Sequence, residues 1–168
     1  MSRSTYDDDI LEWSERQAAA LRRAAHARPN VSNEIDWENV AEEIEDVGRS
    51  QLLAVESLIR QILIHLIKAI SADATEPLMH WRKEVVAFHT DVMKRMTPSM
   101  RSRLDFAEIW RDALKQAEAD LAAHGQSLMP SVLNGRFPLA LDDITDPDFD
   151  FLATVRALRD HYENSHSA

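Results

Sequence analysis

The stretch that decides the fold is residues 36–71, DWENVAEEIEDVGRSQLLAVESLIRQILIHLIKAIS. Apolar side chains recur in it every three or four residues, which is the spacing of one face of an α-helix. They are Trp37, Val40, Ile44, Val47, Val55, Ile59, Ile62, Leu66 and Ile70. Asp36 is a good N-cap, because its carboxylate can accept hydrogen bonds from the first free backbone N–H groups. The pattern predicts one long helix, with Gly48 marking either a bend or a close contact with another helix.

Segments on both sides of this stretch show the same helical spacing. A first helix is expected from Asp7, as its cap, to about residue 25. Its apolar stripe would consist of Ile10, Trp13, Gln17, Leu21 and Ala24. Further helices are expected from Pro77 to about residue 96 and from Thr97 to about residue 123, because proline suits the first position of a helix. A last helix would open at Asp146, after a looser stretch over residues 125–138.

No window of the sequence alternates polar and apolar residues in the manner of a strand. The sequence therefore predicts an all-α fold, a single compact domain of five or six helices with a four-helix bundle-like core and a long central second helix. In this division residues 6–124 hold the four main helices, residues 125–163 a loop with a C-terminal helical extension, and residues 164–168 a tail. Each main helix carries one tryptophan, expected to anchor a common core. These are Trp13, Trp37, Trp81 and Trp110.

The composition limits the classes of function. With 29 acidic and 19 basic residues among 168, the chain has a formal net charge of −10, which disfavours binding to the phosphate backbone of nucleic acids. The absence of cysteine excludes disulfides, thiolate metal sites and cysteine nucleophiles. The first nine residues do not have the pattern of a signal peptide, and the most apolar run, residues 58–70, is too short and too polar to cross a bilayer. We therefore expect a cytoplasmic protein with no membrane span.

Sequence motifs of catalysis are absent from the chain. It contains neither the G-x-S-x-G of a strained serine nucleophile nor the glycine-rich loops that cradle phosphates. The sequence leaves open whether the protein is an enzyme, and no cofactor is expected.

The densest polar feature is the row of carboxylates early in the long helix. Helical spacing places Glu38, Glu42 and Glu45 on one face, and Arg49 follows Glu45 by four residues. Such a row could bind a divalent cation or a basic partner. The alternative, which we favour, is a solvated face stabilised by the positive end of the helix dipole.

Histidines of the second and third predicted helices are the other candidates for chemistry. The residues best placed to hold a metal ion would be Glu42, His65 and His80, but they lack the short-range spacing of most helical metal sites. His65 borders the apolar face, where a hydrogen-bonded structural histidine is the commoner outcome. We therefore expect no metal site.

Several blocks of the sequence together resemble a known bacterial family. The blocks are YD at 6–7, Trp13, QAAALR at 17–22, DWENVAEEIEDVGRS at 36–50, LIHLIK at 63–68, Trp81, TPSMR at 97–101, FP at 137–138 and DPDF at 146–149. In this order, over roughly residues 6–150, they are similar to the family catalogued as a domain of unknown function, number twenty-nine. The resemblance implies a compact, all-helical protein and carries no assigned activity. The residues that match the family's motifs are Asp36, Trp37, Glu42, Glu43, Glu45, Gly48, Arg49, His65 and Lys68. Of these, the candidate functional residues are Asp36, Trp37, Glu42, Glu45, Arg49, His65 and Lys68.

Three hypotheses of function follow from these features. The first is a non-enzymatic protein-interaction module that acts through the acidic helix face or through self-association. The alternative is a metal-dependent or small-molecule-binding enzyme, whose site is formed by Glu, His and Arg side chains of the second and third helices. Nucleic-acid binding through the basic residues near the turn at residue 97 ranks last because of the net charge.

Overall fold

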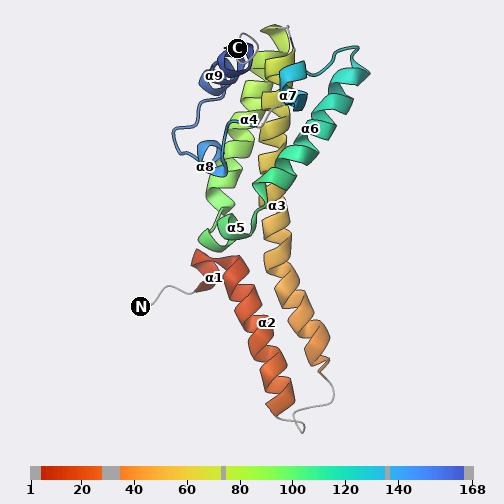
Figure 1. The fold of residues 1–168 in the computed structure, drawn as a ribbon. Coiled ribbons are helices and arrows are strands. Elements are labelled where there is room, and N and C mark those ends of the chain that lie inside the picture. Colours follow the sequence, from red (N-terminus) through yellow and green to blue (C-terminus); the bar gives the residue numbers. More distant parts are fainter. Residues whose placement is uncertain (1–4, 28–34, 73–74, 135–136, 165–168) are drawn as a thin grey trace. The chain divides into compact units, whose positions relative to one another are not determined.

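The computed structural model describes residues 5–27, 35–72, 75–134 and 137–164, and most of these residues are helical (Figure 1). The described part contains no strand, which confirms the all-α prediction. It holds nine helices instead of five or six, because four short helices join the main ones. The helices are α1 (Thr5–Asp8), α2 (Ile10–Ala27), α3 (Trp37–Ser71), α4 (Thr75–Arg95), α5 (Pro98–Arg103), α6 (Phe106–Ala123), α7 (Pro130–Asn134), α8 (Leu141–Ile144) and α9 (Phe151–Asn164).

Helix α3 is the long element that the opening stretch predicts. Asp36 caps it as expected, since its Oδ1 accepts from the backbone N–H of Asn39 at 3.2 Å and its carbonyl accepts from that of Val40 at 3.0 Å. Its second half differs from the prediction of a single apolar stripe, because residues 62–67 are all buried. A helix that is apolar on every side lies inside its domain rather than on the surface.

Other helices begin at positions that differ from the prediction, because a neighbouring aspartate serves as the N-cap. The first long helix begins after Asp9 instead of Asp7, and the helix expected over residues 97–123 is broken at Leu104. There the backbone is extended, and Asp105 accepts from the N–H of Glu108 at 3.0 Å to start α6. The last helix likewise begins after Asp150. Aspartate competes for free backbone N–H groups and so favours a new helix start over continuation.

Two predicted helix boundaries are confirmed. Thr97 caps α5, with Pro98 as the first helical residue. Gly125 follows α6 with a φ of +69°, the left-handed conformation that glycine adopts most readily. Its N–H donates to the carbonyl of Ala122, and that of Gln126 donates to the carbonyl of Leu121. This is the Schellman arrangement, which satisfies the last carbonyls of a helix.

The chain divides into two compact units. Unit 1 comprises Met1–Val55 and Arg95–Leu104, and unit 2 comprises Glu56–Lys94 and Asp105–Ala168. Helix α3 therefore contributes its first half to unit 1 and its second half to unit 2. The buried apolar side chains are unevenly shared. Unit 1 has few among its described residues: Leu11, Ala18, Ala41, Val55 and Met100. Unit 2 has many large ones, including Ile59, Ile62, Leu63, Ile64, Leu66, Ile67, Val85, Val92, Ile144 and Leu158.

The tryptophans do not form the common core that their distribution suggested. All four are half-buried, and the fully buried large side chains are aliphatic apart from Met100. Trp110 stacks on Phe137 with ring centroids 3.9 Å apart. Tryptophan is seldom fully buried, because its size and its indole N–H favour positions at the edge of a core.

Candidate functional site

The candidate residues fall into two groups, one in each unit. Asp36, Trp37, Glu42, Glu45 and Arg49 belong to unit 1. The other candidates, His65, Lys68 and His80, belong to unit 2.

In unit 1 the acidic row of α3 is bound to α2 by an arginine. Arg22 donates from Nε to Oε1 of Glu38 at 2.8 Å and from Nη2 to Oε2 of Glu45 at 3.0 Å. These two hydrogen bonds raise the pKa of Arg22 above its usual value. The sequence contains no local sign of this contact, because α2 and α3 meet only in the tertiary structure. Much of the predicted acidic face therefore stabilises the helix pair.

The remaining candidates of unit 1 do not converge. Arg49 pairs with Asp46 at 2.9 Å and not with Glu45, whose carboxylate is taken by Arg22. Asp36 serves as a helix cap, and Trp37 is half-buried at the first turn of α3. Glu42 is exposed and forms no ion pair or hydrogen bond with the described side chains.

Gly48 marks a close contact between α2 and α3, which decides between the two explanations that the sequence left open. A Cβ at this position would lie 3.0 Å from Cα of Leu11 and closer still to Oγ of Ser14. The other buried residues along this contact are also small, with Ala18 on α2 and Ala41 on α3. Small side chains allow the two backbones to approach.

Small residues occupy most of the buried contact between α2 and α3, which we call the seam of unit 1. The predicted apolar stripes of the two helices therefore do not form this seam. On α3, Val40 and Val47 are 40% and 44% exposed, although each directly precedes a buried residue. On α2, Ile10 and Trp13 also directly precede buried residues, and both remain half-exposed. We call the resulting surface the apolar strip. It consists of Ile10, Trp13, Leu21, Ala24, Val40, Ile44 and Val47.

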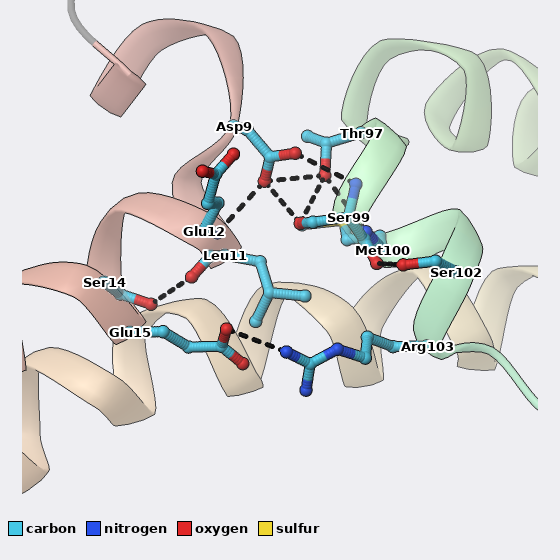
Figure 2. Close-up of polar contacts among 10 residues, drawn as sticks. All are labelled: Asp9, Leu11, Glu12, Ser14, Glu15, Thr97, Ser99, Met100, Ser102 and Arg103. Carbon is cyan, nitrogen blue, oxygen red and sulfur yellow. Dashed lines mark hydrogen bonds and ion pairs between the residues drawn. The ribbon is translucent and has the colours of Figure 1, made fainter.

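A second polar cluster of unit 1, which the sequence did not reveal, surrounds Asp9 (Figure 2). This carboxylate is 6% exposed and accepts from the hydroxyls of Thr97 and Ser99 and from the backbone N–H groups of Ser99 and Glu12. Burial alone would raise the pKa of Asp9, but the hydrogen bonds from Ser99, Glu12 and Thr97 outweigh it and lower the pKa. Asp9 thus ties the start of α2 to the start of α5. Its network is complete within the chain and points to a structural role.

In unit 2 a carboxylate joins two histidines. His65 is buried, and its Nδ1–H donates to the carbonyl of Gln61 at 2.7 Å, while Nε2 lies 2.8 Å from Oε2 of Glu84. Nε2 of His80 lies 3.5 Å from the other oxygen of Glu84. Glu84 was not among the sequence candidates. His65 is thus the hydrogen-bonded structural histidine that its position indicated. No three His, Asp or Glu side chains of the described part are arranged to hold a metal ion, and Glu42 lies in the other unit.

Lys68 lines a cavity of unit 2. Its Nζ lies 5.3 Å from the ring centroid of Trp81 and 3.4 Å from Oδ2 of Asp120, and its side chain is 16% exposed. The cavity beside it has a volume of about 630 Å³. Its lining is Lys68, Pro77, Trp81, Ala119, Asp120, Leu121, Ala123, His124 and Gln126. The sequence singled out Lys68, whereas the contribution of α6 to this site became evident only in the structure.

Within the described part of the chain, no helix has the length and apolar character needed to cross a membrane.

Comparisons with known proteins place the chain in a family. The model of the family described as "Domain of unknown function DUF29" matches residues 5–150, which confirms the resemblance found in the sequence. A crystal structure of an alpha-helical protein of unknown function from Rhodospirillum rubrum is similar to this chain, with 38% identity and a TM-score of 0.84. The similarity covers 94% of this chain and 99% of that one. No curated protein matches. The chain therefore belongs to the DUF29 family.

Proposed function

We propose that this protein is a non-enzymatic interaction module, which binds another protein chain through the α2–α3 helix pair of unit 1. The observation that carries this proposal is the apolar strip. Val40 and Val47 expose 40% and 44% of their surface in a unit whose buried core is thin. Exposed apolar side chains that lie side by side, unlike single scattered ones, are typical of protein-binding surfaces.

The acidic face of α3 supports the proposal less strongly than the strip does. Glu38 and Glu45 are already paired with Arg22, so a basic partner would have to compete with that arginine. Glu42 is the exposed carboxylate of the row that remains available. The two surfaces can be tested separately.

The experiment is affinity capture from a native lysate of the source organism, with recovered proteins quantified for the wild type and three variants. Val47→Lys places a charge on the apolar strip, and Leu53→Lys is the matched control, because Leu53 is 55% exposed on the same helix and outside the strip. Glu42→Lys tests the acidic face. We expect Val47→Lys to lose captured chains that Leu53→Lys retains, whether these are another protein or the protein itself. Equal recovery with all four baits would contradict the proposal.

A second candidate function, binding of a small molecule, is favoured by the cavity beside Lys68. The ammonium of Lys68 lies 3.4 Å from Oδ2 of Asp120, which is a long ion pair. It can therefore also bind a second anion. Trp81 and the side chains of Ala119 and Leu121 offer apolar surface next to that charge. The chemistry fits an aromatic carboxylate, with its ring against Trp81 and its carboxylate on Lys68.

Ligand-observed NMR with benzoate and phenylacetate tests this second candidate. We expect the signals of the probes to broaden in the presence of the protein, and to lose the broadening with Lys68→Met. Lys83→Met is the control, because Lys83 is an exposed lysine of α4 that does not line the cavity. Broadening that persists in Lys68→Met, or is lost equally in both variants, would reject the site.

A further inference from the structure

We propose that the apolar strip is covered by a second copy of this chain. In the dimer we infer, α2 of each copy lies antiparallel on α3 of the other, and the two-fold axis runs parallel to these helices. The inference rests on the proposed function, because it names the chain that the interaction surface binds. Four features of unit 1 support the dimer, namely the shared face of the two stripes, their register, the charges beside them and the area they offer.

The stripes of α2 and α3 lie on the same face of the helix pair. The two helices run side by side in opposite directions, with Leu11 against Gly48 and Arg22 against Glu38 (Figure 1). On both helices, exposed apolar residues come one position before buried residues of the seam. One position along an α-helix is a rotation of about 100° about the helix axis, and this rotation has the same sense on both helices. In an antiparallel pair, equal rotations away from the seam place both stripes on one face. The apolar strip is thus a single continuous surface.

The register of the helix pair allows that surface to pack on itself. Facing positions of α2 and α3 have residue numbers that add to about 60, as the close approach of Gly48 to Leu11 and Ser14 shows. A two-fold rotation about an axis parallel to the helices does not shift positions along them. Residues that face each other between copies therefore also have numbers that add to about 60. It places Trp13 opposite Val47, Gln17 opposite Ile44, Leu21 opposite Val40, and Ala24 opposite Trp37.

The charges that border the strip select this arrangement. On α2 the border carries Arg16, which pairs with Glu12 of its own helix at 3.7 Å, and Arg23. On α3 it carries Asp36 and Glu43, and all four of these border residues are exposed. In the proposed dimer Arg16 of one copy meets Glu43 of the second copy, and Arg23 meets Asp36. An axis perpendicular to the helices would instead place α2 on α2, and arginines would then face arginines. Charge pairing thus fixes the orientation, while apolar contact supplies the attraction.

The size of the surface is close to what a dimer requires. From Ile10 to Ala24 the apolar strip is about 22 Å long. With two helices it is about 20 Å wide, so each copy would contribute about 450 Å². Two copies together would bury about 900 Å², near the roughly 1,000 Å² at which specific interfaces begin. The interface completes unit 1 by giving two thin helix pairs a shared four-helix core.

Sedimentation equilibrium tests the proposal on the full chain. We expect the wild type to form dimers, Val47→Arg to weaken dimerisation by about tenfold or more, and Leu53→Arg to leave it unchanged. Leu53 is the matched control, because it is 55% exposed on the other side of α3. Far-UV circular dichroism of each variant checks that it folds. A wild type that remains monomeric at about millimolar concentration overturns the inference, since its dissociation constant would then lie above about 1 mM, too weak for a specific dimer.

A charge swap keeps the test independent of any folding defect at Val47. Glu43→Arg alone should weaken the dimer, and Arg16→Glu added in the same chain should restore it, because the interface is symmetric. Failure of the second change to restore the dimer rejects the proposed pairing of Arg16 with Glu43.

Cross-linking tests the orientation, and the natural chain is suited to it because it has no cysteine. Chains with Gln17→Cys and chains with Ile44→Cys are mixed under mild oxidation. We expect a disulfide-linked heterodimer from this mixture and little from a mixture of Gln17→Cys with Leu53→Cys chains. A stronger product from Gln17→Cys alone would reveal α2 on α2 and reject the arrangement.

Failure of this inference can be told apart from failure of the proposed function. If the wild type is monomeric, yet Val47→Lys loses a captured protein that Leu53→Lys retains, the strip binds a different chain and only the dimer is rejected. If the wild type is monomeric and neither variant changes the recovered proteins, both proposals are rejected.

Discussion

In unit 1, some residues are important because their side chains are small or absent, and others because their side chains form hydrogen bonds. Gly48 brings α3 onto α2 because it has no side chain, and Ser14 and Ala18 face the same contact with small ones. Asp9, by contrast, is a buried charge that is fully hydrogen-bonded by two helix starts. The sequence marked Gly48 as unusual, since glycine inside a helix costs about 1 kcal/mol. It did not mark Asp9, because Asp7, Asp8 and Asp9 are equally plausible caps until Thr97 and Ser99 are brought beside one of them.

Gly48→Ala is expected to destabilise the protein although alanine favours helices. The added Cβ would press on Oγ of Ser14 and on Cα of Leu11, and crowding of this kind costs about 1–3 kcal/mol, against a helix-propensity gain of about 1 kcal/mol. Urea denaturation measures the net effect as a lower midpoint. Ser50→Ala, at an exposed position of the same helix, is the control and should raise the midpoint slightly or leave it unchanged. A gain in stability with Gly48→Ala would show that the helices can separate without loss.

Asp9→Asn is expected to destabilise the protein by about 1–2 kcal/mol near pH 7, because the amide cannot accept all the hydrogen bonds that the carboxylate accepts. The pKa of Asp9 in the folded protein lies below its ordinary value of 3.8. Its ionised form therefore contributes stability above that value, and the contribution is lost as the pH falls through the lowered pKa. The difference between wild type and variant should shrink as the pH falls below 3.8 in thermal unfolding experiments. A difference that is constant with pH would contradict the role of the charge.

At the scale of elements, aspartates decide where helices begin. Asp36, Asp105 and Asp150 each accept a hydrogen bond from the N–H three residues ahead. Periodicity alone could not place the break at Leu104, because the apolar spacing continues from α5 into α6. The side chain of Asp105 competes with the helical hydrogen bonds at that point. The spacing of apolar residues carries no information about this competition. Element type could thus be predicted more accurately than element boundaries.

Asp105→Ala is expected to lower the stability of the protein by about 1 kcal/mol through loss of the cap of α6. Thermal unfolding followed by circular dichroism measures the effect. Asp112→Ala, which removes an exposed aspartate from the middle of the same helix, is the matched control and should change stability less. Equal effects of the two changes would mean that the cap is not important and that the break at Leu104 has another cause.

At the scale of the whole molecule, the two units differ in how much apolar surface they bury. Unit 2 surrounds residues 62–67 of α3 on every side, whereas unit 1 leaves Val40 and Val47 exposed. Dimerisation through the apolar strip would make the stability of unit 1 depend on protein concentration, because association favours the folded state by mass action. The midpoint of thermal unfolding should therefore rise with concentration in the wild type and in Leu53→Arg. In Val47→Arg the rise should require protein concentrations about tenfold higher or more, and the same dependence as in the wild type would contradict the proposed interface.

The sequence by itself determined that the fold is all-α, that α3 is long and capped by Asp36, and that α6 ends before Gly125. Helical spacing, caps and glycine conformation depend on neighbours within a few residues, so they can be read along the chain. Only the tertiary structure decided that Leu11 and several small residues, and not the predicted apolar stripes, form the seam between α2 and α3. It also decided that Arg22 occupies the acidic row and that Lys68 lies between Trp81 and Asp120. These contacts join residues far apart in the sequence, and the spacing of one helix contains no information about the side chains of another.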